Sequence, residues 1–303
     1  MASSTRRCEE PSPRAMDWAA LPHDILASVF LKLGLREVMR SAGFACKSWR
    51  RVAIEEPALW RRIEMTPVRR SCRGWRAMVT ATVERAAGQC VAFSGPCDDQ
   101  SLIHLVERCC LLRMIIHHFH TVKKVTVIST TLFSTCILTG RHSCRAPLLQ
   151  SLDLYDYVAC NDVLTESITR LHHLEDLEIS PAYNCSEASR KLFQPVCRAC
   201  PSLKRLVMGY QMLHNDMPGR SRFDIREELE IPVMHELSYL ELFNCEISRK
   251  ALLMILDSCP QLESLHILGS SVFPHFGMGG ELGLKCARIQ NLTIPGHVRR
   301  SQR

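Results

Sequence analysis

The stretch LSYLELFNCEISRKALLMILDSCPQLESLHI, residues Leu237–Ile267, joins two short strand patterns through one helical pattern. Apolar residues take every second position in Leu240–Leu242 and again in Leu265–Ile267, which is typical of strands with one buried face. Between them, apolar residues recur at helical spacing in Leu252–Leu256, and Pro260 ends that helix. The stretch therefore predicts a unit of strand, helix and strand.

The strand pattern L-x-x-L-x-L, with apolar replacements, recurs along the chain. The copies are Leu149, Leu152, Leu154; Leu174, Leu177, Ile179; Leu203, Leu206, Met208; Leu237, Leu240, Leu242; Leu262, Leu265, Ile267; and Ile289, Leu292, Ile294. Their starts are 25, 29, 34, 25 and 27 residues apart, mostly within or at the edge of the range of leucine-rich repeats. A unit of one strand and one helix cannot bury its apolar side alone, so the pattern predicts an α/β solenoid of stacked units.

The polar residues between these leucines should point away from the core, on one strand-lined face. Such a face is suited to binding another protein. The target-binding candidates are Asp153, Asp176, Glu178, Arg205, Tyr239, Glu241 and His266. The alternative for each residue is a solvated strand position without a binding role.

The first sixty residues have a different pattern, which predicts three short helices. They are expected at Pro22–Leu33, Leu35–Ala42 and Phe44–Ile54, with a short helical turn at Leu59 and Trp60. Three helices of this size make a small core, yet the segment is rich in large apolar side chains. It either packs on the rest of the chain or offers an apolar face to a partner.

The order of several short motifs in this segment resembles an F-box. The motifs are Leu21-Pro22, Ile25-Leu26, Leu33, Cys46-Lys47-Ser48-Trp49-Arg50 and Pro57-Ala58-Leu59-Trp60. Followed by cysteine-containing repeats, they resemble a plant F-box/leucine-rich-repeat subfamily. The resemblance implies a Skp-type adaptor bound through Leu21, Pro22, Ile25, Leu26, Val29, Leu33 and Trp49. It also implies a cullin-RING ubiquitin-ligase core beyond the adaptor, and a target protein bound by the repeats for ubiquitination. A repeat scaffold without a ligase role is the alternative.

The domain organisation that we expect follows these patterns. It consists of a flexible arm (1–16), an F-box (17–64), a linker with a capping helix (65–89), repeats (90–296) and a tail (297–303). Residues 110–146 are atypical, because two candidate strands there start only 11 residues apart. They represent either an insertion or an imperfectly spliced gene model.

Composition narrows the function further. With 46% hydrophobic residues, a formal net charge of +7 and no long apolar run, the chain is expected to be a soluble protein of the nucleus, the cytoplasm or both, without membrane or nucleic-acid partners. Its 16 cysteines are expected to be reduced. We predict no catalytic residues, cofactor or metal: the cluster Cys109, Cys110, His117, His118 and His120 fits zinc badly, and Cys197–Cys200 is a lone CxxC.

Overall fold

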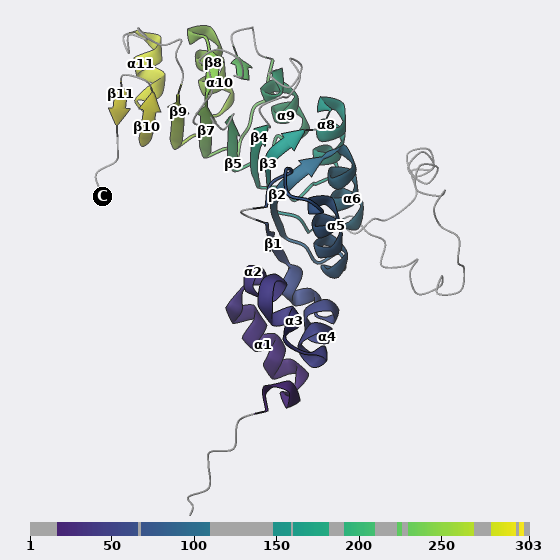
Figure 1. The fold of residues 1–303 in the computed structure, drawn as a ribbon. Helices are drawn as coiled ribbons and strands as arrows, with labels where there is room; N and C mark the ends of the chain where they lie inside the picture. Colours follow the sequence, from purple (N-terminus) through teal and green to yellow (C-terminus); the bar gives the residue numbers. More distant parts are fainter. Residues whose placement is uncertain are drawn as a thin grey trace, which may run out of the picture. The chain divides into compact units, whose positions relative to one another are not determined.

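The computed structural model describes residues 17–65, 68–109, 148–158, 160–181, 191–209, 223–225, 230–269, 280–294 and 297–299. The chain divides into two units, Met1–Leu59 and Trp60–Arg303. We call the first the helical module and the second the repeat body (Figure 1).

The helical module is built from short helices around the longer α1. Its elements are η1 (Trp18–Ala20), α1 (His23–Leu33), α2 (Leu35–Glu37), the π-helical turn η2 (Val38–Ala42), α3 (Gly43–Ala45), α4 (Lys47–Glu55) and η3 (Pro57–Trp60). Pro22 precedes α1, and Gly34, with φ +81°, ends it. A residue with a side chain is strained at that φ, which explains why glycine stands at this turn.

The third helix begins later than the sequence predicted. The expected break before Phe44 is absent, and helical structure continues to Ala45. The break lies at Cys46, whose backbone is extended (φ −157°, ψ 174°). Gly43 is not a helix stop: a Cβ there would lie 2.9 Å from the Val38 carbonyl oxygen, so glycine allows close packing inside the helix.

The repeat body contains one long sheet, and helices connect many of its strands along the chain. Its strands are β1 (Arg62–Glu64), β2 (Ala92–Asp98), β3 (Ser151–Val158), β4 (Asp176–Pro181), β5 (Arg205–Gly209), β6 (Phe223–Ile225), β7 (Tyr239–Phe243), β8 (Cys245–Ile247), β9 (Ser264–Leu268), β10 (Asn291–Ile294) and β11 (His297–Arg299). Its helices are α5 (Trp75–Arg85), α6 (Asp99–Cys109), α8 (Asn161–Thr169), α9 (Phe193–Ala199), α10 (Arg249–Ser258) and α11 (Glu281–Cys286).

The order of strands in the long sheet is β1-β2-β3-β4-β5-β7-β9-β10-β11 over the described ranges. All neighbours are parallel except β10 and β11, which are antiparallel. In Figure 1 these strands follow one another along an arc, with the helices on its outer side. The predicted α/β solenoid of short parallel strands and helices is confirmed.

The repeated leucine positions form the core between strands and helices. The three apolar residues of each of the six L-x-x-L-x-L copies are at most 4% exposed. Parallel pairing places equivalent positions side by side, as with Leu206 between Leu177 and Leu240. Each strand therefore covers the apolar side of its neighbour, which is the stacking that the spacing predicted.

Two local features of the repeat body complete the described elements. Helix α9 begins at Phe193 and has Pro195 in its first turn, where a backbone N–H has no helical partner, so the helix accommodates this proline. Strand β6 pairs with β8 in a small second sheet.

The strands that precede and follow residues 110–147 in the sequence, β2 and β3, are neighbours in the sheet. Strand β2 pairs directly with β3, from Ala92 with Ser151 to Asp98 with Val158. No other strand separates them in the described sheet. The proposed insertion or splicing error at 110–146 falls outside the described residues, so it stays a hypothesis.

Leu206→Ala should destabilise the repeat body by about 2–5 kcal/mol, because it opens a cavity at a fully buried position between two neighbouring repeats. Thermal and denaturant unfolding of the full chain would measure the loss. The control is Ser151→Ala, on the polar side of β3, which should change the free energy of unfolding by less than about 1 kcal/mol. Equal losses would contradict the assignment of the two faces.

Candidate functional site

The side chains that hold α1 in the helical module lie on one side of it. Leu26 and Phe30, one turn apart, are at most 1% exposed. Phe30 meets Trp49 of α4 edge-on, with ring centroids 5.5 Å apart. The Trp49 indole N–H donates to the carbonyl oxygen of Trp18 over 2.9 Å. These contacts fix the rotation of α1 about its axis, and hence the residues that it turns to solvent.

Another side of α1 carries an apolar stripe, which we define as Pro22, Ile25, Val29 and Leu33. Residues 25, 29 and 33 are four apart, so they lie one above the other on the helix. Ile25 is 48% and Leu33 44% exposed; Pro22 is also exposed, and Val29 is half-buried. A row of exposed aliphatic side chains on a small helical module is typical of a surface that another protein covers.

Three of the predicted adaptor-binding residues lie outside the apolar stripe. Leu26 is in the core, with no exposed surface, so its assignment as a contact residue stays a prediction that the geometry of the module does not favour. Successive residues of an α-helix are rotated by about 100°, which turns Leu26 inward where Ile25 faces out. Leu21 and Trp49 are half-buried, and the contacts of Trp49 make it a support for α1.

The sequence interpretation missed other exposed apolar side chains of the module. Trp18 is 57%, Leu31 57%, Phe44 72% and Ile54 42% exposed. The run from Ile25 to Leu35 is apolar almost all round, so its periodicity does not separate buried from exposed positions. Their exposure depends on how α1 packs on α4, which the local sequence does not state.

The repeat body presents the polar side of its strands, which we call the strand face. Side chains at alternate positions of a strand point to opposite faces, so this face lies opposite the buried leucines. The register brings all seven predicted target-binding residues together in two adjacent rows. One row contains Asp176, Arg205 and Tyr239, and the other contains Asp153, Glu178, Glu241 and His266.

Arg205 lies at the centre of the strand face and bridges two carboxylates. Its guanidinium donates to Asp176 over 2.8 Å and to Glu178 over 3.2 Å, and its Cζ lies 5.3 Å from the centroid of the Tyr239 ring. Burial alone would lower the pKa of Arg205, but the two carboxylates raise it on balance. Val207, which the register places between Glu178 and Glu241, is only 2% exposed.

Tyr239 continues this network toward the C-terminal strands. Its hydroxyl donates to Glu241 over 2.5 Å, and its ring centroid lies 5.4 Å from that of His266. His266 Nδ1 is 3.1 Å from the hydroxyl oxygen of Thr293. Burial and the bond to Glu241 raise the pKa of Tyr239 to about 12, so the hydroxyl stays protonated and occupies one oxygen of Glu241 at neutral pH.

Two carboxylates of the strand face ionise less readily than usual. Burial raises the pKa of Asp153. The hydrogen bond that its carboxylate accepts from the Ser94 hydroxyl, over 2.6 Å, lowers the pKa by less than burial raises it. Burial and the neighbouring charge of Asp153 raise the pKa of Glu178, against the influence of Arg205. The positive charge of Arg205 therefore offsets only part of the negative charge of these carboxylates.

The cysteines that suggested redox or metal chemistry are packing residues where the structure describes them. Cys197 and Cys200 are at most 7% exposed, and both are free thiols. Burial raises the pKa of Cys200 to about 12 and that of Cys197 well above its usual value, so neither is a ready nucleophile.

The described ranges contain no group of three or more His, Cys, Asp or Glu side chains arranged to hold a metal ion. Of the candidate zinc cluster, only Cys109, buried on α6, is described; the other members fall outside the described residues. No helix in the described part of the chain is long and apolar enough to span a bilayer.

Comparison with protein families matches both units. Residues 18–66 match the F-box-like family model, and residues 166–293 match a model of the LRR repeats of an FBD-associated F-box protein. The chain therefore combines an F-box-like segment with a segment similar to the leucine-rich repeats of an F-box protein. The helical module contains most of its F-box match, and the repeat body contains the whole repeat match. Neither model describes a catalytic domain.

Several relatives are named for the same combination. Three Arabidopsis thaliana proteins, named putative F-box/LRR-repeat proteins 23, 22 and 9, are 27%, 28% and 26% identical to this chain. The alignments cover 97%, 96% and 88% of this chain. The chain spans 58% of the first relative, 79% of the second and 94% of the third.

Asp153→Asn should stabilise the repeat body near neutral pH. Because the folded-state pKa of Asp153 is raised, its ionisation disfavours the folded state. This penalty is absent below the ordinary pKa of an aspartate and grows as pH rises through the raised pKa. The variant should therefore unfold at a higher temperature near pH 7, but not near pH 3, in thermal unfolding scans.

The control for this comparison is Glu166→Gln, at an exposed position of α8. It removes one carboxylate without touching the strand face, so its effect should be small at both pH values. A gain for Asp153→Asn that is the same at low and neutral pH would show that desolvation of this carboxylate is not its source.

Proposed function

We propose that this chain is the substrate-recognition subunit of an SCF-type ubiquitin ligase. The F-box binds a Skp-type adaptor, which connects it to a cullin-RING core, and the repeats bind a target protein for ubiquitination. The observation that carries the proposal is the exposed apolar stripe on α1, because three of its four residues, Pro22, Ile25 and Leu33, belong to the motifs that resemble an F-box. Catalysis would reside in the partner subunits, in the nucleus, the cytoplasm or both.

The chemistry of the apolar stripe supports its role as an adaptor surface. Ile25 and Leu33 each leave nearly half of their surface in water, and covering aliphatic surface contributes roughly 25 cal/mol per Å². Exposed polar residues, Asp24, Ser28 and Lys32, lie beside them on α1. An apolar centre with a polar rim is the usual arrangement of a protein–protein interface.

Contact and support are separate roles in this proposal. Pro22, Ile25, Val29 and Leu33 would touch the adaptor, with Leu21 at the start of the helix. Leu26 would act indirectly, by holding α1 at the rotation that exposes the stripe. This division makes two adjacent residues, Ile25 and Leu26, experimentally distinguishable.

Ile25→Asp with Leu33→Asp should weaken binding of a Skp-type adaptor by at least about thirtyfold, because charges would be buried where aliphatic groups make the interface. Binding is measured with the full chain and purified adaptor by calorimetry. The matched control is Leu284→Asp, the same chemical change at a position of α11 that is 78% exposed. Loss of binding in the control, or full binding by the double variant, would refute the adaptor surface.

Leu26→Ala should behave differently from Ile25→Ala. The first removes a fully buried side chain and should destabilise the module by about 2–5 kcal/mol, whereas the second should leave its stability within about 1 kcal/mol and weaken adaptor binding. Unfolding of the full chain by circular dichroism and adaptor binding are measured on both. A stable Leu26→Ala variant would show that this residue does not hold α1.

A protein-interaction scaffold without a ligase role is the second candidate function. It is favoured by the repeat body itself, whose Trp60–Arg303 unit has its own sheet and core. In that case the full chain would bind its target but would not bind the adaptor. Recovery of adaptor together with target from one pull-down separates the two functions.

A further inference from the structure

A third row of side chains lies beside the two polar rows of the strand face. Parallel register joins Gly209 to Phe243 and Phe243 to Leu268, at the carboxyl ends of β5, β7 and β9. Leu268 is 39% exposed and Phe243 is half-buried. A Cβ at Gly209 would overlap the Phe243 ring, so the absence of a side chain there lets the ring lie against the strand. The row offers a fixed apolar contact next to the carboxylates.

The polar rows are acidic at the centre of the face. From β3 to β7, the described face carries four carboxylates, Asp153, Asp176, Glu178 and Glu241, against one guanidinium, Arg205. The whole chain has a formal charge of +7, so this sign is local to the face and does not follow from composition. Charge complementarity favours a cationic occupant.

The single guanidinium does not neutralise the face. Arg205 is engaged by Asp176 and Glu178, while Asp153 and Glu241 accept bonds from the uncharged hydroxyls of Ser94 and Tyr239. The raised pKa values of Asp153 and Glu178 have the same cause, partial burial without enough positive charge. A bound cation would lower the cost of keeping these carboxylates ionised.

We infer that the strand face binds an extended basic segment of the target, in which lysine or arginine side chains stand next to an apolar one. The basic groups pair with Asp153, Glu178 and Glu241, and the apolar side chain covers Phe243 and Leu268. The inference rests on the proposed function of this face as the target-binding surface and specifies the chemistry of the target.

The spacing of the strands sets the spacing of the basic residues. Glu178 and Glu241 are in the same row, two strands apart, which corresponds to about 10 Å. An extended segment in the polyproline II conformation rises about 3.1 Å per residue and returns to the same side every three residues, so basic residues three positions apart match the two carboxylates.

The test uses the full chain and labelled twelve-residue peptides, with binding followed by fluorescence anisotropy. The probe has arginine at every third position and leucine beside it. One comparison peptide replaces each arginine with glutamate, and another replaces each leucine with serine. The arginine–leucine probe should bind at least tenfold more tightly than either comparison peptide, and added salt should weaken its binding.

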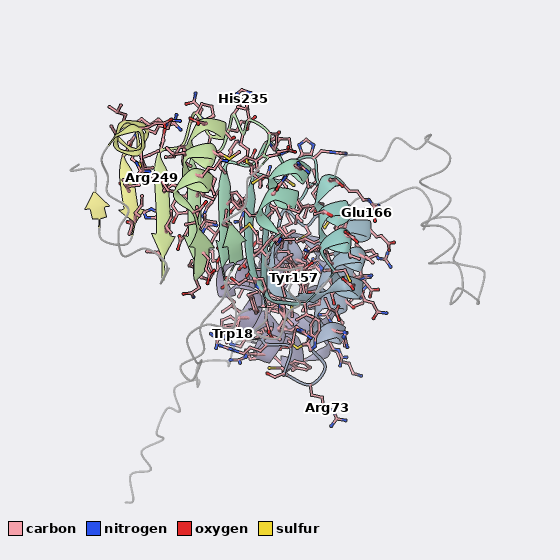
Figure 2. The ribbon with its side chains drawn as sticks, turned by 90° about the horizontal axis from the view of Figure 1, so that it is seen from above. Trp18, Arg73, Tyr157, Glu166, His235 and Arg249 are labelled. Atoms are coloured by element: carbon pink, nitrogen blue, oxygen red, sulfur yellow. The ribbon has the colours of Figure 1, made fainter. Side chains whose placement is uncertain are left out.

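Variants locate the binding. Asp153→Asn with Glu241→Gln should weaken the arginine–leucine probe at least tenfold, and Leu268→Ser should reduce its advantage over the serine peptide. The matched control is Asp162→Asn with Glu166→Gln, two exposed carboxylates of α8 on the helix side, where Figure 2 labels Glu166. The control should bind as the unmodified chain does.

Several outcomes would overturn the inference. They are equal binding of the glutamate and arginine peptides, insensitivity to salt, and equal losses in the face variant and the α8 control. Adaptor binding, measured on the same variants, separates this inference from the proposed function. A chain that binds the adaptor but not the basic probe refutes only the basic target segment, whereas a chain that ignores the adaptor refutes the ligase role.

Discussion

The structure of the repeat body depends on the burial of each strand's leucines against the neighbouring repeat. A single strand and helix leave an apolar side in water, and only the next unit covers it. Leu177, Leu206 and Leu240 stand side by side in consecutive strands and are fully buried. Since this packing uses one side of every strand, the other side is left to solvent with its residues in register. The packing of the leucines in the core therefore determines which residues form the strand face.

The helical module solves the same problem on a smaller scale. Leu26, Phe30 and Trp49 use one side of α1 for packing, which leaves Ile25 and Leu33 exposed. A core of three short helices does not have room for every apolar side chain of its sequence. Exposure of the remainder favours association with another protein. Both units thus bury one side of their elements and present the other.

Periodicity was sufficient to predict the repeats, because each leucine position is repeated and each has the same environment. It was also sufficient to predict that Asp176, Arg205 and Tyr239 share one strand-lined face. It did not indicate that Leu26 is buried, since an element that is apolar almost all round does not reveal its buried side. It also did not indicate the helix break at Cys46, whose backbone is extended. Tertiary contacts decide these features, and no short stretch of sequence contains them.

The direct pairing of β2 with β3 has a consequence for how substitutions on the strand face are coupled. The two strands are held by their own ladder of hydrogen bonds and by Phe93 and Leu152 in the core. Residues that are far apart in the sequence are therefore neighbours on the sheet, as the hydrogen bond from the Ser94 hydroxyl to Asp153, 59 residues away, illustrates. A substitution at either of these two positions changes the surroundings of the other, so the two positions are free to vary only together.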